Sequence, residues 1–200
     1  DFDVHTIFAN SNWSKLNPTV NVTLVSNKEL SKISNQKNPN NVLAIAIIKE
    51  SKISNKRGVV LVLDNISDPG NLGTIIRTCD WFGVTSIICS NNTVDVYNPK
   101  VVQSTMGSIF RVKIIYTDLA KYLKNVKSVI YGTLFDGNNI KEVDFKDDLH
   151  IVIGNESNGI SKEISNLISE KIKINSKYSK ADSLNVAVAT SILLYEITNS

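Results

Sequence analysis

The sequence predicts an α/β domain built on a mostly parallel sheet with helices on both faces. Residues 59–63 form a continuous apolar run, VVLVL, which is typical of a strand buried on both faces. The apolar residues that follow recur at helical spacing: Leu72, Ile75, Ile76, Cys79 and Phe82. Beyond residue 86, strand-like and helix-like segments alternate to the end of the chain, as they do in parallel sheets.

The later segments extend this domain from residue 56 to residue 200. Strands are expected at 86–89, 112–115, 129–134, 150–153 and 172–174. Helices are expected at 119–123, 163–168 and 184–197. A chain of 200 residues suffices for one such core together with part of a second domain.

Residues 1–55 predict a smaller α/β unit. Residues 20–25 and 42–48 resemble strands, and residues 27–33 resemble a helix. Two strands and one helix bury too little surface to be stable alone, so we expect the latter part of a domain that begins upstream. The polar residues 49–57 fit a linker to the larger domain.

Composition and charge exclude several classes of protein. The hydrophobic content of 42% is too high for a disordered chain, and no apolar run could cross a bilayer. The N-terminal residues lack the features of a signal peptide. A net charge of +3 permits a polyanionic partner without requiring one. Cys79 and Cys89 lie in apolar surroundings, which indicates reduced thiols and a cytoplasmic protein, and their spacing predicts no metal site.

The first of three polar loops is NISDPGNLGTIIRT, residues 65–78. Parallel sheets bind ligands at loops that leave the carboxyl ends of strands, and this loop follows a predicted strand. A turn at residues 68–70 places Asn71 where it can cap the next helix, and Gly73 allows another chain or a ligand to come close. Arg77 follows one turn later. A capped turn with a surface arginine would explain these residues equally well.

The second and third loops are IGNESNGIS, residues 153–161, and DSLNVAVATSILLYE, residues 182–196. Glu156 stands just outside a buried strand between glycines, which makes it a candidate for ligand contact. Asp182 or Ser183 can cap the last helix, with Asn185 in its first turn. A solvated glutamate and a packed C-terminal helix are the simpler explanations of these loops.

Several common motifs are absent from the sequence. It has no G-x-G-x-x-G after a strand, no G-x-x-x-x-G-K-[ST] and no G-x-S-x-G. Dinucleotide, nucleoside triphosphate and hydrolase functions therefore have little support. The residues alone support an α/β ligand-binding domain with three polar loops.

Together the three loops resemble the motifs of the SpoU/TrmH family of SPOUT RNA methyltransferases, in the same order: N-x-x-DPGN-x-G-x-x-x-R, GNE-x-x-G-[IL]-S and SLNV-x-VA. The segment STMGSIFRV, residues 104–112, resembles the family's segment between the first two motifs. The resemblance implies a homodimer and a C-terminal trefoil knot, which is rare among folds. Residues 1–55 resemble the latter part of an L30e-like RNA-binding domain.

The resemblance implies transfer of a methyl group from S-adenosylmethionine to a ribose 2′-hydroxyl of structured RNA, with ribosomal RNA favoured over transfer RNA. It implies catalytic roles for Arg77, Asn71, Glu156, Ser183 and Asn185. It places the cofactor against Thr133, Leu134, Ile153, Gly154, Glu156, Ile174 and Leu184. By resemblance, Arg77 matches the family's catalytic arginine, which is proposed to activate the hydroxyl. Since a free guanidinium stays protonated, Arg77 could instead bind phosphate and stabilise alkoxide charge.

Some alternatives remain open at this stage. The family usually has proline where Asn175 stands, so Ile172 could replace Ile174 at the cofactor. The rival functions are a non-catalytic RNA-binding protein with a SPOUT fold and a SPOUT enzyme that methylates a base. A generic α/β protein that binds a small molecule is the third rival.

Overall fold

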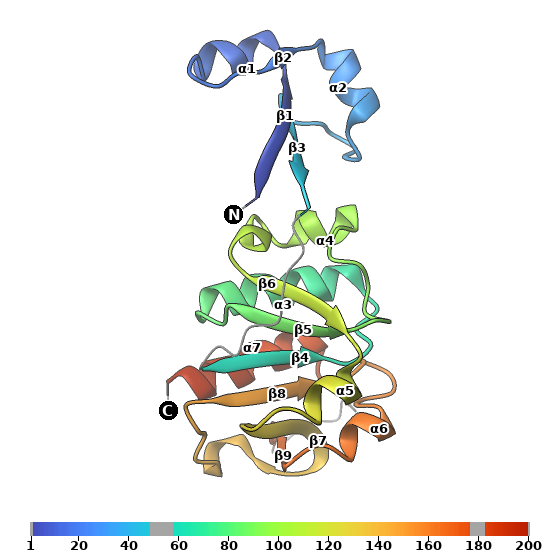
Figure 1. Ribbon diagram of the computed structural model, residues 1–200, viewed down its shortest axis with the longest axis vertical. Helices are drawn as coiled ribbons and strands as arrows, with labels where there is room; N and C mark the ends of the chain where they lie inside the picture. The colour runs from blue at the N-terminus through green and yellow to red at the C-terminus, as the bar shows by residue number, and fades with distance from the viewer. Residues whose placement is uncertain (1, 49–57, 177–182, 200) are drawn as a thin grey trace. The chain divides into compact units, whose positions relative to one another are not determined.

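The computed structural model describes residues 2–48, 58–176 and 183–199, and the chain divides into two compact units, Asp1–Glu50 and Ser51–Ser200 (Figure 1). The predicted linker, residues 49–57, lies outside the described residues. None of the described helices is both long and apolar enough to cross a membrane.

The N-terminal unit holds a three-stranded sheet in the order β2-β1-β3. Strand β1 (Asp3–Ala9) pairs parallel to β2 (Thr23–Leu24) and antiparallel to β3 (Val42–Ile47). Helices α1 (Ser11–Leu16) and α2 (Asn27–Ile33) follow β1 and β2. The sequence predicted α2 and β3 but neither β1 nor α1. Strand β1 buries only its last residue, Ala9, and α1 buries no residue, so neither has a strong apolar pattern.

The C-terminal unit is a six-stranded sheet in the order β6-β5-β4-β8-β7-β9, with all its pairs parallel. This confirms the predicted parallel α/β class. The strands are β4 (Val59–Leu63), β5 (Ser86–Ser90), β6 (Lys113–Thr117), β7 (Val129–Asn139), β8 (Leu149–Ile153) and β9 (Glu170–Lys173). The helices are α3 (Pro69–Trp81), α4 (Pro99–Ser104), η1 (Ser108–Phe110), α5 (Leu119–Leu123), η2 (Ile140–Glu142), α6 (Lys162–Ser165) and α7 (Val186–Thr198).

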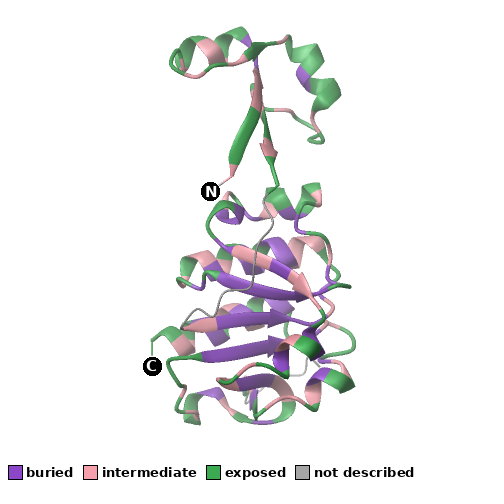
Figure 2. Ribbon diagram, viewed as in Figure 1, coloured by how far each residue is buried: buried purple, intermediate pink, exposed green. Residues whose placement is uncertain are grey.

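The core lies along the central strands, as Figure 2 shows. Strands β5 and β8 are buried along their whole length, and β4 is buried from its second residue. Helices α5 and α6 cover one face through a cluster that includes Val62, Leu119, Val152 and Ile164. Helix α3 packs against α7 on the other face (Figure 1). Apolar burial on both faces explains why these strands are continuous apolar runs.

Several predicted bounds differ from the structure; for example, the helix expected at 163–168 is Lys162–Ser165 and the strand expected at 20–25 is only Thr23–Leu24. Two other differences have a clear physical reason. Strand β7 continues to Asn139 rather than ending at residue 134, because it pairs with β9 a second time after an irregularity between Thr133 and Asn138. Helix α7 begins at Val186 rather than at residue 184, because the side chain of Asn185 caps it.

Both cysteines are free and buried in the C-terminal unit, as predicted. Burial raises the pKa of the Cys89 thiol to about 12 and raises that of Cys79 still further. Because the thiolate is the reactive form of cysteine, these side chains serve as apolar packing groups.

Candidate functional site

Three loops from distant parts of the sequence meet at the carboxyl edge of the sheet. The Asn71 amide nitrogen donates a hydrogen bond of 2.6 Å to Glu156 Oε1. The Asn185 amide nitrogen donates one of 3.0 Å to Asn71 Oδ1. Asn71 is therefore the middle of a three-residue chain, which we call the Asn71–Glu156–Asn185 triad. The structure thus brings together one candidate residue from each polar loop.

The first loop is capped by a different residue from the one predicted. The N-cap of α3 is Asp68, whose carboxylate accepts the Asn71 backbone N–H at 2.8 Å. Pro69 occupies the first helical position, where its fixed φ suits the helix and its missing N–H costs little. The prediction that Asn71 caps α3 was wrong. Because Asp68 takes that role, the Asn71 side chain can reach Glu156 instead.

The start of α7 also differs from the expectation. Asn185 is the N-cap itself, and its Oδ1 accepts the N–H groups of Ala187 and Val188. The same side chain uses its nitrogen to hold Asn71, so it fixes the helix start against the first loop. Ser183 is exposed two residues before this cap, and Asp182, the other cap candidate, lies outside the described residues.

Helix α3 carries Arg77 on an exposed face. Gly73 lies on the same helix, and a Cβ there would collide with Ser104 of α4 and approach the Val101 carbonyl oxygen. The close approach predicted for Gly73 is therefore made by the chain itself. No hydrogen bond or ion pair within the described ranges holds the Arg77 guanidinium. Its five donors are available for a partner outside the protein.

The second loop folds back on itself directly after β8. Asn155 and Gly159 exchange two backbone hydrogen bonds, of 3.0 and 2.8 Å. A Cβ on Gly154 would collide with the backbone of Gly159, and Gly159 has a φ of +67°. Both glycines are therefore required by the loop, which holds the partly buried Glu156 at its tip.

The residues expected at the cofactor lie at the same edge. Ile153 ends β8, Gly154 follows it, and Ile174 follows the last residue of β9. Thr133 donates a hydrogen bond to the Val152 carbonyl, and its neighbour Leu134 is half-buried. Leu184, 48% exposed, lies just before the start of α7. These positions combine backbone groups with partly exposed apolar side chains, a surface that suits an uncharged heterocycle.

Sequence reasoning missed the polar residues beneath these loops. Asp64 directly follows β4 and is only 2% exposed. Asn65 comes next with a φ of +60°, and the Asn155 amide donates to its carbonyl oxygen at 2.8 Å. The sequence does show a charged residue, Asp64, directly after an apolar strand, and such a residue is a candidate for a buried polar contact.

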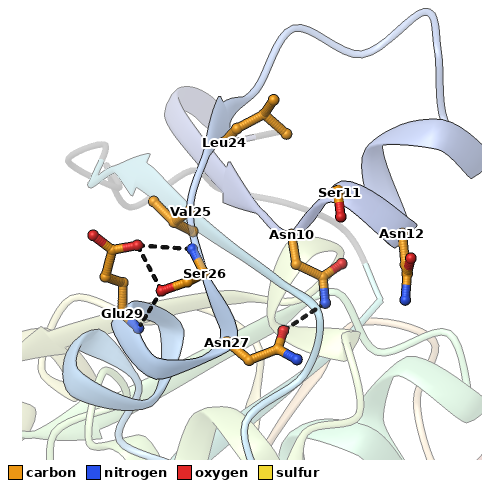
Figure 3. Close-up of a pocket in the computed structure, with 8 residues that line it drawn as sticks. All are labelled: Asn10, Ser11, Asn12, Leu24, Val25, Ser26, Asn27 and Glu29. Carbon is orange, nitrogen blue, oxygen red and sulfur yellow. Dashed lines mark hydrogen bonds between the residues drawn. The ribbon is translucent and has the colours of Figure 1, made fainter.

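The N-terminal unit has a separate hollow (Figure 3). Its lining residues are Asn10, Ser11, Asn12, Leu24, Val25, Ser26, Asn27 and Glu29. The Asn10 side chain links the segments around this hollow. Its amide nitrogen donates to Asn27 Oδ1 at 2.7 Å and to Asn41 Oδ1 at 2.9 Å. A capping box at Ser26 and Glu29 fixes the start of α2 beside it.

The fold and the candidate site place the chain in the class of α/β proteins with a parallel sheet, a class in which ligands generally bind in loops at the carboxyl ends of the strands. Residues 58–195 match the model of the SpoU rRNA Methylase family. The chain belongs to this family.

The chain is similar to characterised and uncharacterised relatives over most of its length. It is 31% identical over 191 residues to the 23S rRNA (guanosine(2553)-2′-O)-methyltransferase RlmP of Bacillus subtilis, covering 92% of this chain and 75% of that protein. It is 30% identical over 201 residues to an uncharacterized tRNA/rRNA methyltransferase of Synechocystis, covering 92% of this chain and 73% of that protein.

Solved structures of similar proteins share the fold. A putative RNA methyltransferase of the TrmH family from Porphyromonas gingivalis superposes with a TM-score of 0.89 and 30% identity, covering 98% of this chain and 82% of that one. The AdoMet-bound rRNA methyltransferase from Sinorhizobium meliloti gives a TM-score of 0.87 and 28% identity, covering 99% and 80%.

Proposed function

We propose that the chain methylates RNA with S-adenosylmethionine, and that the Asn71–Glu156–Asn185 triad organises its active site. As a member of the SpoU rRNA methylase family, it is an RNA methyltransferase that acts on a ribose 2′-hydroxyl, with ribosomal RNA favoured over transfer RNA. The observation that carries the assignment of the site is the hydrogen-bonded meeting of the three loops.

The cofactor fits the carboxyl edge beside the triad. Backbone groups at Thr133, Gly154 and Ile174 would hold the adenosine, with Leu134, Ile153 and Leu184 as apolar neighbours. Ile174 is favoured over Ile172, because Ile172 is fully buried in β9 and pairs with both parts of β7. When bound, S-adenosylmethionine supplies a methyl group whose bond to a positively charged sulfur breaks as an aligned oxygen attacks the methyl carbon. The trefoil knot that encloses the cofactor in this family is part of the proposal.

Arg77 is proposed to act on the RNA. A guanidinium presents its donors in a planar fork, so Arg77 binds a phosphate beside the target ribose through two parallel hydrogen bonds. In that position its charge also stabilises the negative charge that develops on the 2′-oxygen as the hydroxyl proton passes to solvent water. Asn71 and Glu156 fix the two loops around the reacting groups, and Ser183 and Asn185 position the third loop. Holding the hydroxyl in line with the methyl group is a large part of the expected rate enhancement.

A homodimer is proposed on the evidence of one exposed helix face. Helix α7 carries three apolar residues at helical spacing, Val188, Ile192 and Tyr195, and Leu184 lies just before the helix. Each of the four is more than a third exposed. Contiguous exposed apolar residues mark interaction surfaces in soluble proteins. This face begins next to Asn185, so a second copy would border the site. Replacing Ile192 with Glu should yield a monomer in light scattering, whereas an unchanged mass would refute this interface.

The N-terminal unit is proposed to bind substrate RNA as part of an L30e-like domain spanning residues 1–55. Its strand and helix pattern and the amide-lined hollow at Asn10 and Asn27 support this role. A cytoplasmic location is proposed because the substrate is RNA and both cysteines are free thiols.

Methyl transfer by the purified chain tests the function. The protein is incubated with methyl-labelled S-adenosylmethionine and unmodified ribosomal RNA, with transfer RNA in a parallel reaction. Digestion to nucleosides and mass spectrometry then locate the label. The proposal predicts label in a 2′-O-methylnucleoside. Label on a base, or no label with either RNA, would contradict it.

A further inference from the structure

A buried carboxylate lies beneath the proposed cofactor loop. Asp64 is 2% exposed, although charged side chains are seldom buried unless they are paired. Both of its oxygens accept hydrogen bonds. The Asn65 amide donates to Oδ1 at 2.9 Å, and the Ser161 backbone N–H donates to Oδ2 at 2.7 Å. Ser161 is the N-cap residue of α6 and ends the loop that follows β8.

A second link joins the same two loops one residue further on. The Asn155 amide donates to the Asn65 carbonyl at 2.8 Å, and the Asn65 N–H donates to Ser90 Oγ at 2.9 Å. Asn65 adopts a φ of +60°, a conformation that asparagine tolerates better than most residues. Because Ser90 ends β5, the cluster joins the carboxyl ends of β4 and β5 to the loop that leaves β8.

These links hold the loop between residues 154 and 161 at both of its ends. Its start is fixed at Asn155 by Asn65, and its end is fixed at Ser161 by Asp64. Between them the loop closes on itself through the Asn155–Gly159 pair and carries Glu156. We infer that Asp64 is a positioning residue that holds this loop in the shape that binds S-adenosylmethionine. The inference rests on the function proposed above.

The donors around Asp64 explain why a carboxylate is needed. Both partners present N–H groups, and an ionised carboxylate offers only acceptors. Asparagine has nearly the same shape, but its NH₂ group would face one of these donors. Asp64→Asn therefore places two donors opposite each other, or forces the Asn65 amide to turn over and give up the Ser90 hydroxyl that its oxygen accepts, with little change in volume.

A second variant removes the donor rather than the acceptor. Ser161 has a φ of −60°, which proline adopts, and its side chain makes no capping hydrogen bond. Ser161→Pro therefore deletes the N–H that Asp64 accepts while keeping this angle. If the Asp64–Ser161 contact positions the loop, the two variants share one defect. The double variant should then be no worse than the more impaired single variant.

Asp148→Asn is the matched control. Asp148 also accepts a backbone N–H, that of Gly58 at 2.6 Å, but it does so at the amino ends of β4 and β8. It is therefore also a contact between a carboxylate and a backbone N–H that joins these two strands, but it is exposed and lies at the edge away from the proposed site. Asp148→Asn should keep the wild-type affinity for S-adenosylmethionine.

The experiment measures cofactor affinity by calorimetry, RNA affinity, and kcat at saturating S-adenosylmethionine. Asp64→Asn and Ser161→Pro should each weaken cofactor binding by about tenfold or more. RNA affinity should stay within about threefold of the wild-type value, since the defect lies in a loop assigned to the cofactor, whereas kcat should also fall because the same loop carries Glu156. Thermal unfolding confirms that each variant is folded; if Asp64→Asn does not fold, Ser161→Pro decides.

Wild-type cofactor affinity in both variants would overturn the inference. So would an equal loss of cofactor and RNA affinity, or the same loss in Asp148→Asn, because each would indicate a general structural role. A wild-type chain that binds no S-adenosylmethionine would instead defeat the proposed function, and the inference with it.

Discussion

Asn71 and Glu156, 85 residues apart in the sequence, are joined by a hydrogen bond of 2.6 Å. The pairing of β4 with β8 explains their proximity. Leu63 and Ile153, the last residues of these strands, are register partners, so the loops that carry Asn71 and Glu156 leave the sheet side by side. The neighbouring order of these two strands thus creates the site.

A double-mutant cycle tests whether this pair acts as a unit. Asn71→Ala and Glu156→Ala should each lower kcat/KM, because each leaves a polar partner unsatisfied. We expect the double variant to be less impaired than the sum of the two, with a coupling energy of about 1–3 kcal/mol. Strictly additive effects would show that the contact has no role in catalysis.

Arg77→Ala should abolish methyl transfer while leaving S-adenosylmethionine affinity within about twofold, because the proposed role of Arg77 is toward RNA. Arg77→Lys should restore little activity, since an ammonium group cannot make two parallel hydrogen bonds to phosphate. Single-turnover kinetics and calorimetry check both statements. Full activity in Arg77→Ala would remove this residue from the mechanism.

Two glycine substitutions should differ according to what a new Cβ would meet. At Gly154 it would collide with the backbone of Gly159, so the loop must open and cofactor affinity should fall sharply. At Gly132 it would meet the side chain of Ile168 rather than backbone, so Ile168 must move and Gly132→Ala should cost about 1–3 kcal/mol of stability. Calorimetry measures the cofactor affinity of both variants, and urea unfolding measures their stability. Wild-type cofactor binding by Gly154→Ala would refute the packing argument.

His150 should make stability depend on pH. It lies in β8 between Tyr122 Oη and Ser128 Oγ, each 2.8 Å from a ring nitrogen, and burial lowers its pKa to about 4. The unfolded chain, with an ordinary pKa near 6.5, therefore binds more protons than the folded chain between these values. The contribution of neutral His150 to the free energy of unfolding is fully present above about pH 6.5. The free energy of unfolding falls by on the order of 2–3 kcal/mol toward pH 4.

Comparison with His150→Gln isolates this contribution. The difference in unfolding free energy between the wild type and the variant, measured in urea at pH 7 and near pH 4.5, should shrink at the lower pH. A difference that stays constant, or that grows on acidification, would contradict the assignment.

The buried elements were predicted well because their apolar pattern reports burial directly. The predictions for residues 59–63 and 119–123 match β4 and α5 residue for residue. Helices α1 and α4 escaped prediction because they are short and bury at most one residue. Their side chains carry little apolar periodicity for a sequence pattern to detect.

The sequence singled out three residues that the structure joins by hydrogen bonds, Asn71, Glu156 and Asn185, but it did not predict all of their local contacts. Asp68 and Asn71 are both good capping residues, and the local sequence alone does not choose between them. The structure shows Asp68 as the cap and Asn71 as the link to Glu156. Asp64 could not be assigned, because its partner Ser161 is 97 residues away and only the register of β4 with β8 brings them together.

A structure of the chain with bound S-adenosylmethionine tests the central claim, that three separated loops build one pocket for a methyl donor. We predict that the cofactor lies against the backbone of Gly154 and Ile174 and beside Leu184, with the Asn71–Glu156 hydrogen bond intact. A cofactor bound elsewhere, or a complex in which Asn71, Glu156 and Asn185 lie apart, would contradict the account.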